Sequence, residues 1–99
     1  MVLTVFRTKL NPGVDAEAEA IGTRLYALAT SMPGFVSYRE FQGADGESVA
    51  LVEFASAQEL AAWRNHPEHL DAQRIGRERL FSEYRVQVCT VDRDYAFPA

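Results

Sequence analysis

Residues 35–54, FVSYREFQGADGESVALVEF, decide the fold of this chain. Two runs rich in aromatic and β-branched residues, 35–41 and 49–54, lie on either side of the polar segment GADG at 43–46. The Asp-Gly pair in that segment is typical of a tight turn that joins antiparallel strands. The stretch therefore predicts a β-hairpin.

The segment before the hairpin predicts a strand followed by a helix. Val2–Leu10 is apolar and β-branched, and it ends at an Asn-Pro-Gly turn signal at 11–13. Asp15 can cap the helix that follows, and this helix ends before Pro33. Its apolar residues recur at three- and four-residue spacing, as expected of one buried helix face: Ala18, Ile21, Leu25, Leu28, Ala29 and Met32.

The segment after the hairpin predicts two short helices and a last strand. Ser56 and Glu59 form a capping box that opens a helix. Pro67 suits the first position of a second helix, predicted over Pro67–Phe81, so the helical region is bent. Tyr84–Val91 alternates in the manner of a strand.

The resulting order is β-α-β-β-α-β. This order is typical of a ferredoxin-like α+β fold, in which both helical layers pack on one face of a four-stranded antiparallel sheet. With 99 residues and no linker or repeat, the sequence predicts one domain over residues 1–99.

The sheet face without helices is also expected to be covered. Val2–Phe6 and Val49–Phe54 are largely apolar at both alternating positions, whereas a wet face would be polar at every second residue. We therefore expect a homodimer in which two sheets pack into a dimeric α/β barrel. Tyr95 and Phe97 of the tail are expected to help across the interface.

Composition excludes several classes of function. The net charge is -4, and the basic residues are scattered among acids, which argues against nucleic-acid binding. No apolar run approaches the roughly 20 residues of a membrane span, so a cytoplasmic protein is the expectation. Cys89 is the single cysteine, so one chain can form neither a disulfide nor a site with several thiolates, and we expect Cys89 to be a small buried residue.

The helix over Pro67–Phe81 has polar residues where an apolar stripe is expected. One side is charged and faces water: Glu68, Asp71, Arg74, Glu78 and Arg79. The opposite side is apolar: Leu70, Gly76, Leu80 and Phe81. His69, Gln73 and Arg77 lie between these apolar residues at four-residue spacing. An unpartnered buried polar group costs roughly 1 to 3 kcal/mol, so the row predicts an internal polar network or a ligand pocket.

These side chains suit a site for an ionisable aromatic ligand. His69 can take a proton near neutral pH, Arg77 can hold an oxyanion, and Gln73 can orient an oxygen function. Trp63 can stack on a flat ring, and Tyr38 and Tyr84 can each add a phenol, although packing at a sheet edge explains the two tyrosines equally well.

Structural roles remain open for the same set. The inward arginine can pair with a strand carboxylate such as Glu40 or Glu53, and the tryptophan can be a core residue. His66 precedes Pro67 and can be a helix cap or part of the pocket. Two histidines without a third ligand make no metal site, so none is expected.

The chain resembles the antibiotic biosynthesis monooxygenase family of dimeric α/β barrels. The resemblance rests on the element order, on the turn at 33–35 leading into Tyr38, and on the run Trp63–His69 before a polar helix. It implies an oxygenase that acts on polycyclic phenols or quinols without flavin, haem or metal, because a deprotonated electron-rich ring can itself reduce dioxygen.

The same superfamily includes haem-degrading enzymes, which combine an Asn on the first strand with a Trp and a later His ligand. Trp63 matches this pattern. Arg7 and Thr8 stand on the first strand instead of Asn, and Gln73 stands ten residues after Trp63, where the ligand is expected.

The leading hypothesis is a dimeric, cofactor-independent monooxygenase for an aromatic or quinol-type small molecule. In it His69 is the base, Arg77 stabilises the substrate anion, Gln73 orients the oxygen function, and Trp63 and Tyr84 pack on the ring.

Two alternatives come from other classes. One is a haem-binding or haem-degrading protein with His69 or His66 as the axial ligand. The other is a non-catalytic small-molecule-binding dimer whose inward row is a satisfied polar network.

Overall fold

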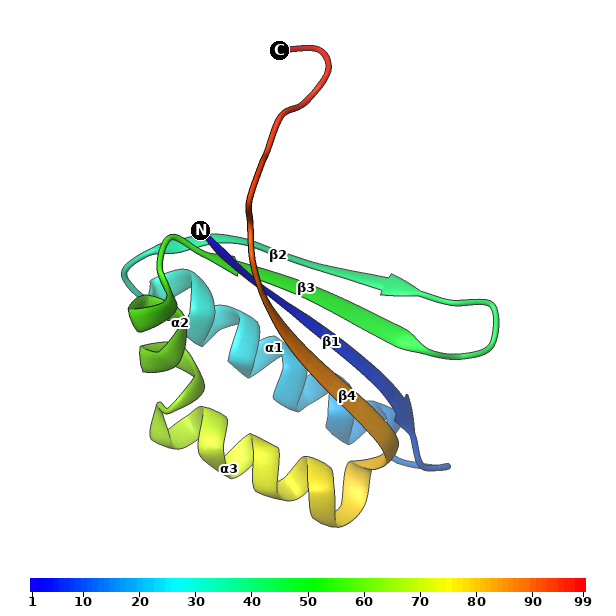
Figure 1. Cartoon of the computed structure of the whole chain (residues 1–99). Helices are drawn as coiled ribbons and strands as arrows, with labels where there is room; N and C mark the ends of the chain where they lie inside the picture. Colours follow the sequence, from blue (N-terminus) through cyan, green and yellow to red (C-terminus); the bar gives the residue numbers. More distant parts are fainter.

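The computed structural model describes residues 1–99 as a sheet covered by helices on one face (Figure 1). The four strands are antiparallel and lie in the order β2-β3-β1-β4. The elements in chain order are β1 (Val2–Leu10), α1 (Asp15–Ser31), β2 (Phe35–Gln42), β3 (Ser48–Phe54), α2 (Ala57–Arg64), α3 (Pro67–Ile75), a π-helical turn η1 (Gly76–Leu80) and β4 (Phe81–Thr90). The predicted ferredoxin-like α+β fold is confirmed.

Three boundaries differ from the prediction. Asp15 does not cap α1, because it is the first residue of the helix and the N-cap position is Val14, without a side-chain hydrogen bond. The last helix does not run as an α-helix through Phe81, because η1 follows it at Gly76 with wider i→i+5 hydrogen bonding. The last strand begins at Phe81 rather than at Tyr84. The bend between α2 and α3 is present, with Asn65 and His66 between the two helices.

The core lies between the sheet and the helices. Alternate residues of β1 and β3 face the helices, in keeping with the two-residue period of a strand. They pack with α1 and α2, and the cluster consists of Val2, Ala29, Ala50, Val52, Phe54, Leu60 and Trp63. Phe54 is fully buried, and its ring stacks on that of Trp63 with 5.7 Å between centroids. Full burial of such a side chain contributes about 1.5 to 3 kcal/mol.

The turn between α1 and β2 requires glycine. Gly34 has φ of 83°, which L side chains rarely adopt, and a Cβ there would collide with the carboxyl group of Glu59. That carboxyl group is held in place because it accepts a hydrogen bond from Ser56 Oγ at 3.0 Å, while Ser56 Oγ accepts one from the Glu59 backbone N–H at 3.1 Å. The predicted capping box therefore also fixes the entry into the hairpin.

The helix-free face of the sheet has an apolar part and a charged end. The register places Leu3 beside Cys89 on β4, and Val5 beside Leu51 on β3. The expected burial of Cys89 is wrong for the single chain: its side chain is exposed, because this register directs it to the helix-free face. None of the helices combines the length and the apolar character that crossing a bilayer requires.

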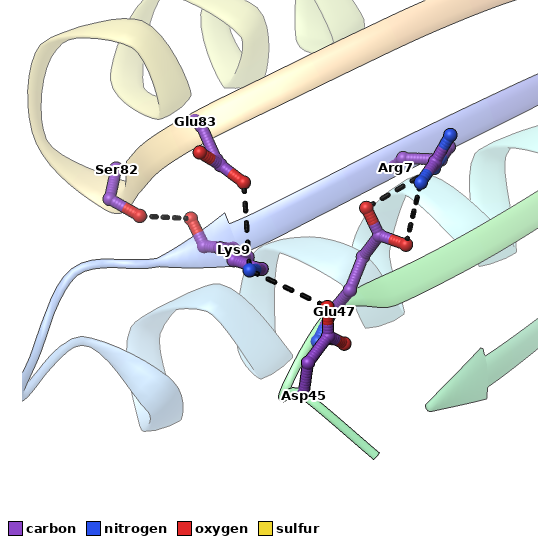
Figure 2. A network of polar contacts seen from close by, with 6 residues as sticks. All are labelled: Arg7, Lys9, Asp45, Glu47, Ser82 and Glu83. Carbon is purple, nitrogen blue, oxygen red and sulfur yellow. Dashed lines mark hydrogen bonds and ion pairs between the residues drawn. The ribbon is translucent and has the colours of Figure 1, made fainter. Parts of the chain in front are cut away.

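The charged end of that face is a paired network (Figure 2). Arg7 on β1 donates through Nε and Nη2 to the two carboxylate oxygens of Glu47, at 3.1 Å each. Lys9 Nζ lies 3.5 Å from Asp45 and 3.8 Å from Glu83. These contacts join β1 to the turn of the hairpin and to β4.

Candidate functional site

A cavity of about 1370 Å³ lies between the sheet and the helices. Its walls come from α1, α3 and the helix-facing side of the strands, and they mix aromatic, aliphatic and polar side chains. The volume is above the range of about 300 to 1,000 Å³ that is typical of small-molecule pockets. The cavity can therefore hold a molecule of several fused rings.

The structure brings most of the predicted site residues to this one cavity. Trp63, His69, Gln73, Arg77 and Tyr84 all line it. They come from α2, α3, η1 and β4. The bend after Trp63 and the turn of the chain into β4 bring these elements to the same cavity.

His69 is half-buried and is the first residue of the polar row. Its Nδ1 lies 3.1 Å from the amide nitrogen of Gln73, one helical turn further along α3. Its ring meets the Trp63 ring edge-to-face with 4.4 Å between centroids. Burial lowers the pKa of His69 to about 4, and the nearby positive charges of Arg64 and His66 also lower it. His69 is therefore neutral at pH 7.

Trp63 is first of all a core residue. Its side chain is 5% exposed, and it packs between Phe54 and the ring of Tyr38, whose centroid is 6.3 Å away. Its Nε1 is buried and has no hydrogen-bond partner. The core role that the sequence left open is thus confirmed, and the residue also lines the cavity, where its contact with a ligand stays a prediction.

Two of the three residues in the predicted polar row, His69 and Gln73, are half-buried in the cavity wall. The side-chain amide of Gln73 contacts His69. The sequence had suggested that Gln73 orients a ligand, but Gln73 is not free to do so independently of the histidine. Arg77 is exposed, so it stands at the rim of the cavity and not inside it. The reason is geometric: eight residues at about 100° each place Arg77 about 80° from His69 around the helix, whereas Gly76 lies about 20° away. Gly76 is buried.

One further expectation about this helix is wrong, and one alternative left open by the sequence does not hold. Leu70, expected on the inner side, is 47% exposed, because it lies about 100° from His69. Arg77 forms no ion pair with Glu40 or Glu53. Instead Glu53 accepts a hydrogen bond from Ser37 Oγ at 3.4 Å.

His66 serves as a helix cap. Its Nδ1 accepts a hydrogen bond from the backbone N–H of Glu68 at 3.1 Å, and the residue does not line the cavity. The capping interpretation is therefore confirmed. The charged side of α3 also faces water as predicted, with Arg74 bridging Asp71 and Glu78 at 2.8 and 3.0 Å.

Two aromatic clusters in the cavity wall were only partly found from sequence. Tyr38 on β2 and Tyr26 on α1 meet edge-to-face at 5.3 Å, next to Trp63. Burial raises the pKa of Tyr38 to about 12, with a contribution from the negative charge of Glu40. Tyr38 is one of the two tyrosines that the sequence offered to the pocket, and it does line the cavity. Tyr26 lies on the exposed flank of its helix and gave no signal.

The second aromatic cluster lies where β1 meets β4. The rings of Phe6, Phe81 and Tyr84 approach one another at centroid distances of 5.6, 6.2 and 6.1 Å. The cavity therefore has an aromatic wall at each end and the His69–Gln73 pair on its helical side. Nowhere does the chain bring three side chains of His, Cys, Asp or Glu together as metal ligands.

Comparison with known proteins identifies the family. The model of the antibiotic biosynthesis monooxygenase family matches residues 1–75. The chain belongs to this family. The matched range includes Trp63, His69 and Gln73, whereas Arg77, Tyr84 and the whole of β4 lie beyond it.

A curated relative is the uncharacterized protein YqjZ of Bacillus subtilis. It is 34% identical over 74 residues, which are 75% of this chain and 65% of the relative. The match thus spans less than two thirds of that protein, and its name carries no activity.

Solved structures confirm the antibiotic biosynthesis monooxygenase fold. The structure of Rv0793 from Mycobacterium tuberculosis has a TM-score of 0.85 at 22% identity, with 96% of this chain and 98% of that chain covered. SnoaB from Streptomyces nogalater, described as a cofactor-independent oxygenase, has a TM-score of 0.79 at 21% identity, with 99% and 97% covered. At these identities the likeness shows the fold alone.

Proposed function

We propose that this chain is a cofactor-independent monooxygenase that acts on an aromatic or quinol-type small molecule. The observation that carries the proposal is the cavity under α3, which has an aromatic wall at each end and a neutral histidine bound to Gln73 between them. Membership of the antibiotic biosynthesis monooxygenase family supports it. So does the likeness to SnoaB, which is a cofactor-independent oxygenase.

This reaction requires few catalytic groups from the protein, because the substrate itself reduces dioxygen. An electron-rich ring that has lost a hydroxyl proton can give electrons to dioxygen directly. One oxygen atom then enters the ring as a carbonyl. The other leaves as water, which takes the one hydrogen of the oxidised carbon and the proton that the hydroxyl group lost. The protein has to bind the ring, stabilise its anion and exclude bulk water.

We assign these roles to different residues of the cavity. Trp63 and Tyr84 contact the ring, and His69 contacts the reacting oxygen through Nε2, the ring nitrogen that Gln73 leaves free. Arg77 at the rim supplies positive charge that favours the anion.

The proposed enzyme is a homodimer. Phe41 is 46% exposed, and Val5 and Leu51 lie side by side on the helix-free face of the sheet. A second copy would cover this face. The tail after β4 runs away from both layers in Figure 1, and its Tyr95 and Phe97 are 84% and 98% exposed, as expected of a segment that packs on a partner.

The test is oxygen uptake with a panel of anthrones and quinols in the presence of a metal chelator. With ¹⁸O₂ as the oxidant, the product should carry one labelled oxygen atom and water the other. Ala72→Phe fills the cavity and should reduce uptake strongly, whereas Ala62→Phe, on the exposed side of α2, should not.

Equal uptake in both variants, or no turnover with any substrate, would contradict the proposal. A parallel hemin titration distinguishes the haem alternative, since a Soret shift that saturates at one haem per chain would favour it.

A further inference from the structure

The contact between Gln73 and His69 determines where the imidazole carries its proton. The Gln73 atom that faces Nδ1, at 3.1 Å, is the amide nitrogen Nε2. An amide nitrogen has two hydrogens to donate and accepts none, so Nδ1 of His69 must accept. A neutral imidazole has one protonated nitrogen, and the proton therefore sits on Nε2 of His69.

Nε2 of His69 is the nitrogen that a ligand can reach. It has no hydrogen-bond partner in the chain. The one side-chain polar atom that is closed off from solvent without a partner is Trp63 Nε1, so His69 Nε2 stays accessible. Because His69 lines the cavity, this N–H is a donor that a bound molecule can use.

Two further donors, Tyr38 and Arg64, line the cavity on the Trp63 side. One carboxylate, that of Glu40, lines it there as well, and its charge acts on Tyr38. Tyr38 keeps its hydroxyl proton, since burial raises its pKa to about 12. Arg64 lines the cavity beside the histidine and lowers its pKa by its positive charge. No carboxylate forms an ion pair or a hydrogen bond with His69. The imidazole itself therefore has no acceptor at Nε2 within the chain, and a ligand atom that accepts a hydrogen bond fits there.

We propose that Gln73 is a positioning residue that holds His69 in the tautomer with its proton on Nε2, so that His69 offers the ligand a hydrogen-bond donor and not a base. The ligand that fits is an aromatic molecule whose oxygen is already an anion near neutral pH. The choice of ligand rests on the function proposed above, but the tautomer does not.

The proposal reverses the role that the sequence suggested for His69. A base must present a free lone pair at the nitrogen that faces the substrate, and here that nitrogen carries hydrogen. The substrate must then arrive ionised, so the class narrows to phenols, enols or quinols whose own acidity is high enough. A neutral donor in a partly buried site stabilises such an anion without a proton transfer.

The test is ¹⁵N NMR of the two ring nitrogens of His69 in the intact protein at pH 8, assigned with His69→Gln. We expect the protonated signal at Nε2 and the unprotonated signal at Nδ1. The opposite pattern would mean that the amide oxygen of Gln73 faces Nδ1, and it would overturn the proposal.

Two variants show whether Gln73 is the cause. In Gln73→Glu the carboxylate can only accept a hydrogen bond, so the proton of the His69 ring should move to Nδ1. In Gln73→Leu the side chain neither donates nor accepts, so His69 should be a mixture of the two tautomers. Gln58→Glu makes the same change at an exposed position of α2 and should leave the signals unchanged. An unaltered tautomer in Gln73→Glu would overturn the proposal.

Kinetics separate this inference from the proposed function. If the wild-type protein turns over a series of quinols, the pH at which kcat/KM reaches half of its maximum should follow the hydroxyl pKa of each substrate. A midpoint that stays fixed across the series would point to a base on the protein and would overturn the donor role. If nothing is turned over, the proposed function fails, while the NMR result still decides the tautomer.

Discussion

The two faces of the sheet carry polar residues in opposite states. On the helix-free face, Arg7 and Lys9 are half-exposed and paired with Glu47, Asp45 and Glu83 (Figure 2). On the helix-covered face, charged side chains also line the cavity, but the two ring systems beside each other on its helical side, those of His69 and Trp63, are neutral and incompletely satisfied. His69 keeps a free Nε2, and the Nε1 of Trp63 has no partner at all.

This difference distinguishes polar groups that stabilise the fold from those available to a ligand. The charges of the outer network are neutralised by neighbouring residues, and their ion pairs link strands that are already hydrogen-bonded. Each pair therefore contributes little to the free energy of unfolding, although it can help to fix the strand register. The inner groups give up solvation and recover only part of it, which costs stability unless a ligand or water completes their bonds. Activity should therefore depend on the inner face, and assembly on the outer face.

The largest expected effect is on activity at the inner face. His69→Ala removes the group that contacts the reacting oxygen, and loss of one such donor typically costs about 100- to 1,000-fold in kcat. Glu68→Ala, the neighbouring residue on the exposed side of α3, should retain activity within about threefold. Stopped-flow or electrode measurements of oxygen uptake check both variants, and equal rates in the two would remove His69 from the site.

The second effect is a pH dependence of stability that belongs to the same histidine. The pKa of His69 is lowered to about 4 in the fold, chiefly by burial, from an ordinary value of 6.5. The unfolded chain therefore binds the proton more readily, so the free energy of unfolding falls as pH drops from about 6.5 to about 4. The loss attributable to His69 is of the order of 3 kcal/mol at most.

Denaturant unfolding at pH 7 and pH 4.5 measures this dependence. The wild-type protein should lose more stability than His69→Gln over the interval, because the carboxylates titrate in both and cancel in the difference. An identical loss in the two proteins would show that the imidazole is not desolvated.

The third effect tests the apolar part of the outer face. Leu51→Lys places a charge between Val5 and Arg39 on that face, in the proposed dimer interface. Burial of the charge against a second copy should weaken dimerisation by about 10- to 100-fold, while the helix-facing core is untouched. Sedimentation velocity at micromolar concentration measures it. A variant that assembles like the wild type, or a wild type that is monomeric, would refute the predicted interface.

The sequence predicted the fold well because the fold depends on local signals. The Asp-Gly turn, the capping box of Ser56 and Glu59, and the alternation of the strands each act within a few residues. The placement of His69 and Gln73 on the inner side of α3 followed from helical periodicity in the same way.

The remaining features of the site depend on rotation and register, which spacing does not fix. Arg77 lies at the rim because the angular offset accumulates over eight residues. Cys89 faces outward because of the pairing of β4 with β1, and a shift of one residue would have turned it inward. The wall formed by Tyr26 and Tyr38 joins a helix to a strand, and no pattern within either segment indicates that contact.

The smallest expected effect lies in the outer charge network. The Arg7–Glu47 pair has two hydrogen bonds of 3.1 Å, but the side chains are 42% and 21% exposed. A double-mutant cycle of Arg7→Ala and Glu47→Ala should give a coupling free energy of about 0.2 to 1 kcal/mol, and salt should reduce it. Oxygen uptake should be the same in all four proteins of the cycle. A coupling well above 1 kcal/mol, insensitive to salt, would mean that this network is buried in the assembled protein, and the contrast between the two faces would then hold only for the isolated chain.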